Sequence, residues 1–189
     1  MSDFNIDIEN CLRVLHRGGV TLYPTDTIWG IGCDATNTEA VNRIYEIKKR
    51  PSNKSFVILV TGEKDILQHV AAPDMEIFGY LQQSEKSVTV IYENVLDIAG
   101  NAMAADGSAA IRICKDEFCR HLIKRFRKPI VSTSANISGE PSPAIFKEIK
   151  PEIISAVDYT VYHRRDDEQK TAASSIIKWK NGKVEVIRK

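Results

Sequence analysis

Three groups of residues in this chain have types and spacings that could carry chemistry. The first is a basic cluster, Lys48, Lys49, Arg50 and Lys54, at the end of a predicted helix that Arg50-Pro51 terminates. Cations in the last turn of a helix complement its dipole, which explains Lys48 and Lys49. Arg50 and Lys54 lie where the helix has stopped, in a loop that leads into an apolar strand. Such a loop is suited to hold an anion, and the spacing alone leaves both interpretations open.

The second group is the polar sequence STSANISG at residues 132–139, directly after a predicted strand. Hydroxyl and amide side chains can satisfy the backbone of their own turn, which is one explanation. However, ligands of α/β sheets bind at the ends of strands, and neutral donors suit phosphate or carboxylate oxygens. The density of such side chains here favours a binding site.

The third group is a single residue, Arg112, in the otherwise apolar sequence AAIRIC at residues 109–114. An unpaired guanidinium is very costly to bury. We therefore expect Arg112 to contact either an acidic side chain or an anionic ligand. The mixed charges of residues 163–168 instead predict a solvated loop.

Other familiar sites are excluded. The sequence GIGCDA at residues 30–35 matches the dinucleotide-binding pattern, but six residues separate it from the preceding strand, so the required tight turn cannot form. Its glycines are better explained by a close approach of the backbone to a neighbour or ligand. No P-loop motif occurs. The four cysteines contain no C-x-x-C pair, so we expect reduced thiols and no protein-bound metal.

These residues must be positioned by alternating strands and helices, which indicates an α/β (α+β) fold. The 43% of apolar residues suffices for one core, so we expect a single domain over residues 1–189, with a twisted mixed sheet and flanking helices. An Asn181-Gly182 turn predicts a hairpin near the end of the chain. Predicted helices cover 8–17, 36–50, 63–82 and 116–127; predicted strands cover 20–23, 55–60, 88–92, 109–114, 129–132 and 176–187.

The net charge of +1 excludes a uniformly basic polyanion-binding protein. The charge is nevertheless uneven: residues 41–54 hold five basic residues against one acidic, and residues 112–128 hold seven against two. A focused cationic pocket is therefore possible. The acidic N-terminus and the absence of long apolar runs predict a cytoplasmic protein with no membrane association.

Five segments together carry a resemblance to a known family. They are TLYPTDTIWGIGCDA (21–35), IKKRPSNKS (47–55), AAIRI (109–113), STSANISG (132–139) and SSII (174–177). In this order and spacing, the chain from about residue 8 to 188 resembles the YrdC/TsaC family of threonylcarbamoyl-AMP synthases. The resemblance implies a YrdC-like sheet with a basic concave site. It also implies condensation of L-threonine, bicarbonate or CO2, and ATP into threonylcarbamoyl-adenylate and pyrophosphate, a nucleotidyltransferase reaction.

The resemblance also implies roles for individual residues. Transfer to an adenosine of tRNA would need separate threonylcarbamoyl-transferase machinery, and Mg2+ would be carried by ATP without a protein-bound cofactor. No protein nucleophile is implied. Threonine would contact Thr27, Ser132 and Ser174, with Arg112 on its carboxylate. Lys48, Arg50 and Lys54 would hold the phosphates of ATP, and the rest of the ATP site would be Ser108, Ser134, Asn136, Ser142 and Arg188.

The chain departs from the family pattern at three places, which are Ser55, Leu59 and Ser87. Leu59 stands where many relatives have a histidine, and Ser87 lies in a segment that often reads G-P-x-T. Two other functions remain open: a module that binds double-stranded RNA or tRNA, and a nucleotide-binding paralogue without synthase activity. The 7% of aromatic residues argues against recognition of single-stranded RNA.

Overall fold

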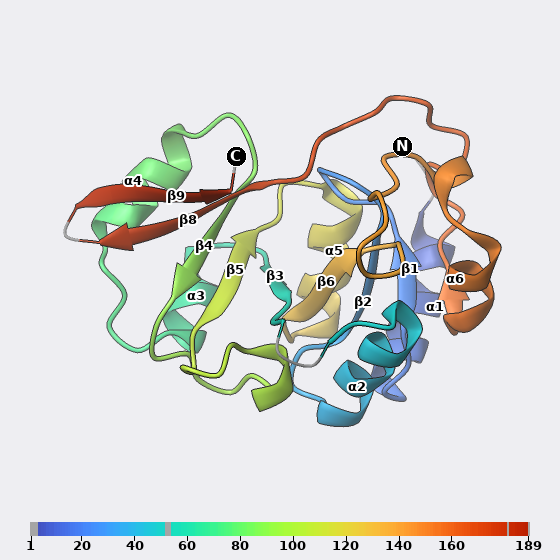
Figure 1. Ribbon diagram of the computed structural model, residues 1–189, viewed down its shortest axis with the longest axis horizontal. Helices are drawn as coiled ribbons and strands as arrows, with labels where there is room; N and C mark the ends of the chain where they lie inside the picture. The colour runs from blue at the N-terminus through green and yellow to red at the C-terminus, as the bar shows by residue number, and fades with distance from the viewer. Residues whose placement is uncertain (1–3, 52–53, 181, 189) are drawn as a thin grey trace.

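The computed structural model describes residues 4–51, 54–180 and 182–188. Its strands are β1 (Thr21–Tyr23), β2 (Gly30–Asp34), β3 (Val57–Val60), β4 (Val88–Tyr92), β5 (Ala109–Ile113), β6 (Ile130–Ser134), β7 (Tyr159–Thr160), β8 (Ser175–Lys180) and β9 (Lys183–Arg188). In the described residues they form one sheet, in the order β7-β1-β2-β6-β3-β5-β4-β8-β9 (Figure 1). Three neighbouring pairs are parallel, namely β1–β7, β3–β5 and β4–β8, and the others are antiparallel. The predicted mixed sheet is confirmed.

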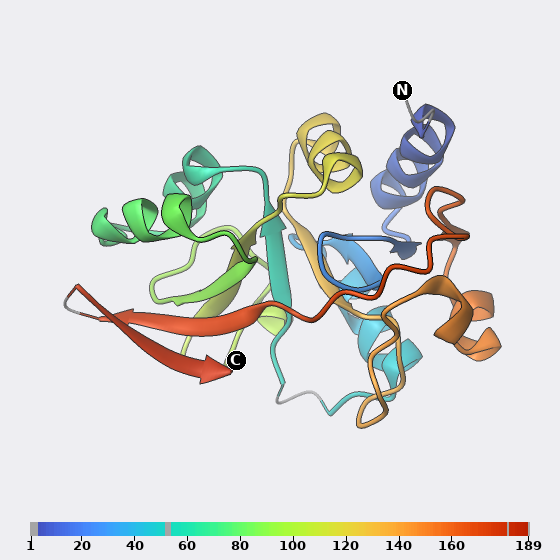
Figure 2. The same cartoon turned by 90° about the horizontal axis from the view of Figure 1, so that it is seen from above.

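Helices flank this sheet. They are α1 (Asn5–His16), α2 (Thr38–Lys48), α3 (Glu63–His69), α4 (Glu76–Gln83), α5 (Glu117–Phe126) and α6 (Pro151–Ala156), with short 3-10 turns at Gly100–Ala102 and Phe146–Glu148. Viewed from above, α1, α3, α4 and α5 lie along one side of the molecule, and α2 and α6 lie along the other (Figure 2). The prediction of an α/β (α+β) fold with flanking helices is therefore correct.

Local sequence explains where α2 and α5 begin. Asp116 begins α5 as predicted, because its carboxylate accepts a hydrogen bond from the Cys119 amide. The start of α2 differs by one residue from the predicted Thr36 cap. Asn37 is the cap, since its side-chain oxygen accepts from the Ala40 amide, whereas Thr36 donates to Asp34.

Strand β2 was missing from the sequence prediction because glycine is unfavourable in strands. The reason for Gly32 is nevertheless the predicted close approach. A methyl group there would overlap the Tyr23 hydroxyl and the Val131 carbonyl of the two neighbouring strands. Gly30 has the same function toward Ser132, whose Oγ would lie 3.0 Å from an added Cβ. The glycines thus leave room for the side chains of Tyr23 and Ser132 against β2.

The core has two parts. One is built from α1, α5 and the middle of the sheet, where Phe4 and Phe118 pack edge to face at 5.6 Å. The other fills the space around α2, α3 and α4, and strands β1, β3 and β6 contribute residues to both parts. Between β7 and β8, residues 161–174 cross the molecule from one end of the sheet to the other (Figures 1 and 2). This crossing segment brings residues near the C-terminus to the middle strands.

The chain ends in the predicted hairpin, in which β8 and β9 are antiparallel. Gly182 has a φ of +70°, as a tight turn requires, while Asn181 lies outside the described residues. Within the described part of the chain, no helix has both the length and the apolar character needed to cross a bilayer.

Candidate active site

A cavity of about 300 Å3 lies over the middle of the sheet, where segments distant in sequence meet. Its walls come from residues 25–30, the loop after α2, the strands β3, β5 and β6, the crossing segment and the end of β9. Three arginines line it, Arg50, Arg112 and Arg188, and no carboxylate does so among the described residues. The lining also includes eight hydroxyl side chains: Thr25, Thr27, Ser55, Ser132, Thr133, Ser134, Ser142 and Ser174. This combination favours an anionic ligand.

Arg112 is the most buried of the three arginines, at 5% exposure. It stands on β5, where the pairing with β3 and β4 fixes its backbone on both sides. Its Nη2 lies 3.4 Å from a carboxylate oxygen of Asp26, and its Nη1 donates to the Thr27 hydroxyl at 3.1 Å. Nε is buried and has no partner. The expected acidic neighbour therefore exists, and the guanidinium still has a free donor.

The other two arginines come from distant parts of the sequence: Arg50 follows α2, and Arg188 is the last residue of β9. Arg50 donates to the carbonyls of Lys54 and Ser55, and its guanidinium lies 4.9 Å from the centre of the Phe56 ring. Burial lowers the pKa of Arg50 without removing its charge at neutral pH. Arg188 donates to the Ser174 carbonyl at 2.8 Å. Each cation is held by neutral carbonyls, which leave its charge uncompensated.

Hydroxyls near Arg112 form two separate hydrogen-bonded pairs. Thr27 shares a 3.0 Å hydrogen bond with Thr25, and Ser174 shares a 2.8 Å bond with Thr89. Ser132 stands on β6 as expected, and that strand continues to Ser134, two residues beyond its predicted end. Of the four predicted threonine contacts, Thr27, Arg112, Ser132 and Ser174, all line the same cavity.

Lys48, predicted to hold the phosphates of ATP, has its ammonium occupied by the chain itself. Its side chain is 1% exposed, and its ammonium donates to the carbonyls of Ser134 and, at 2.7 Å, of Asn136. Burial, and then the charge of Arg50, lowers the pKa of Lys48 to about 7. Lys48 therefore fixes the loop after β6 from behind and does not line the cavity.

Three other predicted ATP residues also lie outside the cavity lining. Lys54 is exposed beside it, and the Ser108 hydroxyl is occupied by Asp106 at 2.6 Å. The Asn136 amide donates to two carbonyls of its own loop, while its buried side-chain oxygen has no partner. The predicted ATP residues that do line the cavity are Arg50, Ser134, Ser142 and Arg188.

The structure also brings forward residues that the sequence analysis missed. Asp26 is buried behind the cavity and pairs with Arg112, yet nothing in its sequence context marks it. Arg164 belongs to the segment predicted as a solvated loop, but it donates to the Thr25 carbonyl and to Asp116, each at 3.1 Å. It thereby ties the crossing segment to the cavity wall. Leu59, in contrast, is fully buried in the core and does not face the cavity.

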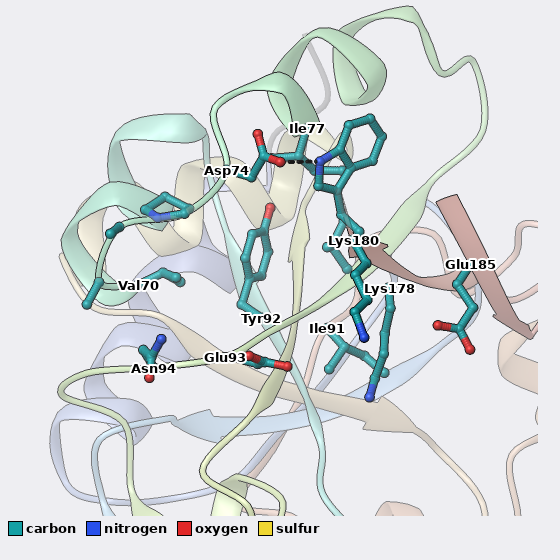
Figure 3. A pocket seen from close by; sticks show the side chains of 15 residues that line it. Val70, Asp74, Ile77, Ile91, Tyr92, Glu93, Asn94, Lys178, Lys180 and Glu185 are labelled. Atoms are coloured by element: carbon teal, nitrogen blue, oxygen red, sulfur yellow. Dashed lines mark hydrogen bonds between the residues drawn. The ribbon is translucent and has the colours of Figure 1, made fainter. Parts of the chain in front are cut away.

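A second cavity, of about 390 Å3, lies beside the first, and Ile91 lines both. It is bounded by the end of β4 and the β8–β9 hairpin, with Trp179 donating to Asp74 above Tyr92 (Figure 3). Lys178 and Lys180 share it with Glu93, Glu185 and Asp74. None of the predicted site residues lines it, and its charges are mixed. We therefore assign the active site to the first cavity, which we call the all-cationic cavity because its charged lining residues are all arginines. No group of three or more metal-binding side chains occurs in the described residues.

Comparison with known proteins agrees with this arrangement. Residues 13–189 match the model of the Sua5/YciO/YrdC family, which is described as telomere recombination. Two relatives are named threonylcarbamoyl-AMP synthase. The one from Hahella chejuensis is 36% identical, over 74% of this chain and 77% of that protein. The one from Xanthomonas campestris is 31% identical, over 80% of this chain and 83% of that protein.

Among solved structures, P. abyssi Sua5 complexed with L-threonine superposes with a TM-score of 0.81 at 21% identity, covering 97% of this chain and 54% of that one. The chain thus spans about half of that Sua5. At this identity the superposition establishes the fold. The named relatives make adenylates, which agrees with the predicted nucleotidyltransferase type of enzyme. The family match and the relatives together show that this chain belongs to the Sua5/YciO/YrdC family.

Proposed function

We propose that this protein is a threonylcarbamoyl-AMP synthase. The observation that carries the proposal is the cavity lined by three arginines, eight hydroxyls and, in the described part of the chain, no carboxylate. Both substrates it has to bring together are anions: ATP, and the carbamate formed from L-threonine and bicarbonate or CO2. The names of the relatives and the threonine complex of P. abyssi Sua5 support the same substrates.

The two ends of the cavity suit the two substrates. At one end, Arg112 lines the cavity together with the hydroxyls of Thr27, Ser132 and Ser174, and its Nη1 donates to Thr27. A guanidinium with free N–H groups matches a carboxylate in shape and charge, so we assign this end to threonine. The other two arginines, Arg50 and Arg188, are assigned with Ser134 and Ser142 to the phosphates of ATP, and Arg188 adjoins the threonine end because it donates to the Ser174 carbonyl. The assignment of Lys48 is changed from a phosphate contact to the support of the loop after β6.

The reaction requires no nucleophile from the protein. A carbamate oxygen forms a bond to the α-phosphorus of ATP, the bond from that phosphorus to the bridging oxygen breaks, and pyrophosphate leaves with the electron pair. The arginines hold the two anions near one another and balance the charge on the transferred phosphoryl group. Mg2+ enters as part of the ATP substrate. The product would serve a separate transferase that modifies tRNA.

The test is the release of pyrophosphate from ATP with and without L-threonine and bicarbonate. Release that needs all three substrates supports the synthase. Release without threonine indicates a nucleotide-binding paralogue, and no release, together with binding of an RNA duplex, indicates an RNA-binding module. Either of those two results contradicts the proposal.

A further inference from the structure

Asp26 lies directly behind the threonine end of the cavity, without lining it. Its side chain is 9% exposed, and three groups contact it from two segments, the end of β5 and the connection before β4. Arg112 Nη2 and the Cys114 thiol each lie 3.4 Å from Oδ1, while the Ser87 hydroxyl donates to Oδ2. Because each carboxylate oxygen has its own donor, the plane of the Asp26 carboxylate is fixed.

Asp26 in turn restricts Arg112. The Nη2 of the guanidinium faces Asp26, and Nη1 faces the Thr27 hydroxyl. A planar guanidinium held at two of its nitrogens cannot rotate, so the direction of the remaining N–H groups is set by these contacts. One of them, on Nε, is buried without an acceptor, although such a group is normally paired.

We propose that Asp26 and Ser87 are positioning residues for the threonine carboxylate. Ser87 fixes Asp26, and Asp26 fixes the guanidinium of Arg112 with its free N–H groups directed at the substrate. Neither residue touches the substrate. The proposal rests on the proposed function, because it takes the carboxylate of threonine as the anion that Arg112 holds in the cavity.

A different function for Asp26 has the opposite consequence. If it only neutralised the charge of Arg112, its negative charge would oppose an incoming carboxylate, and its removal would strengthen threonine binding. If it positions Arg112, its removal weakens binding. The direction of the change therefore distinguishes the two.

The experiment compares Ser87→Ala with Ser84→Ala and Ser87→Thr. Ser84 lies in the same connection, but its hydroxyl donates to the Tyr80 carbonyl and does not contact Asp26. Binding of L-threonine is measured by calorimetry, and KM and kcat by pyrophosphate release. We expect Ser87→Ala to raise the Kd and KM for threonine about 3- to 10-fold, the size of one hydrogen bond, with kcat and the KM for ATP within about twofold. Ser84→Ala and Ser87→Thr stay near the wild type.

Asp26→Asn keeps the shape and an acceptor for Ser87 but removes the charge. We expect it to weaken threonine binding by about 10-fold or more. Equal or tighter binding by Asp26→Asn overturns the proposal, as does a Ser87→Ala variant that changes all kinetic constants together with a lowered unfolding temperature. If Asp26→Asn does not fold, Ser87→Ala carries the test alone. A wild type that binds no threonine contradicts the proposed function, whereas a wild type that binds it with the same affinity as Ser87→Ala contradicts only the positioning.

Discussion

Replacing Arg112 by lysine tests the threonine end of the cavity most specifically. Lysine keeps the positive charge, so Asp26 is not left as an uncompensated buried carboxylate, which would cost about 3–5 kcal/mol of stability. It loses the planar fork that contacts Asp26 and Thr27 at once and leaves Nε free. A single ammonium can replace only part of these contacts.

The expected loss is that of one charge-assisted hydrogen bond to the threonine carboxylate, about 1.5–3 kcal/mol. This corresponds to an increase of about 10- to 150-fold in the KM for threonine. The KM for ATP should stay unchanged, because Arg50 and Arg188 are untouched. The assay is pyrophosphate release at saturating ATP and bicarbonate with threonine varied.

The matched control is Arg125→Lys, since Arg125 pairs with Glu9 on the surface and both side chains are about half exposed. It should leave both KM values and kcat as in the wild type. Two results would contradict the assignment of Arg112 to threonine. One is an Arg112→Lys variant that binds threonine as the wild type does. The other is a variant in which the KM for ATP rises while the KM for threonine is unchanged.

Three further outcomes follow from the geometry. Arg50→Ala should raise the KM for ATP about 10-fold or more with threonine binding unchanged, and a change in the threonine KM alone would reverse the assignment of the two ends. Gly32→Ala should lower the free energy of unfolding by about 1–3 kcal/mol, because the added methyl group overlaps atoms of β1 and β6. The measurement is urea denaturation, and an unchanged urea midpoint would show that the strands can move apart at this position. Because burial lowers the pKa of Lys48 from 10.5 to about 7, the unfolded chain binds more protons than the folded one between these values. The free energy of unfolding should therefore rise with pH across this window, and this contribution should be lost as the pH falls toward 7; Lys48→Met should flatten the slope measured by urea denaturation.

Patterns of apolar residues predicted the local elements well where they were strong. The β-branched residues of β4 correctly predicted a strand from Val88 to Tyr92, and the cap residue Asp116 correctly predicted the start of α5. Strand β2 could not be found in this way. Its glycines are required because atoms of the neighbouring strands lie very close to them, and the local sequence carries no information about those neighbours. The 3.6-residue periodicity of α2 likewise did not reveal that Lys48, on its last turn, points inward to two carbonyls.

The site was predictable residue by residue but not as an assembly. The cost of burying a guanidinium correctly required a partner for Arg112, yet only the fold identifies that partner as Asp26. Asp26 and Ser87 are 61 positions apart, and the contact depends on how β4 and the segment before β2 meet. The same holds for Arg164, which a run of mixed charges placed in solvent and the crossing segment places against the cavity wall.

The central claim is that the all-cationic cavity joins threonine carbamate to the adenylate of ATP. The most direct test is mass spectrometry of a reaction containing the protein, ATP, L-threonine and isotope-labelled bicarbonate. The proposed function predicts threonylcarbamoyl-adenylate that carries the label and that disappears when threonine is omitted. If pyrophosphate is released but no labelled adenylate is formed, or if the label is absent from the adenylate, the claim is contradicted.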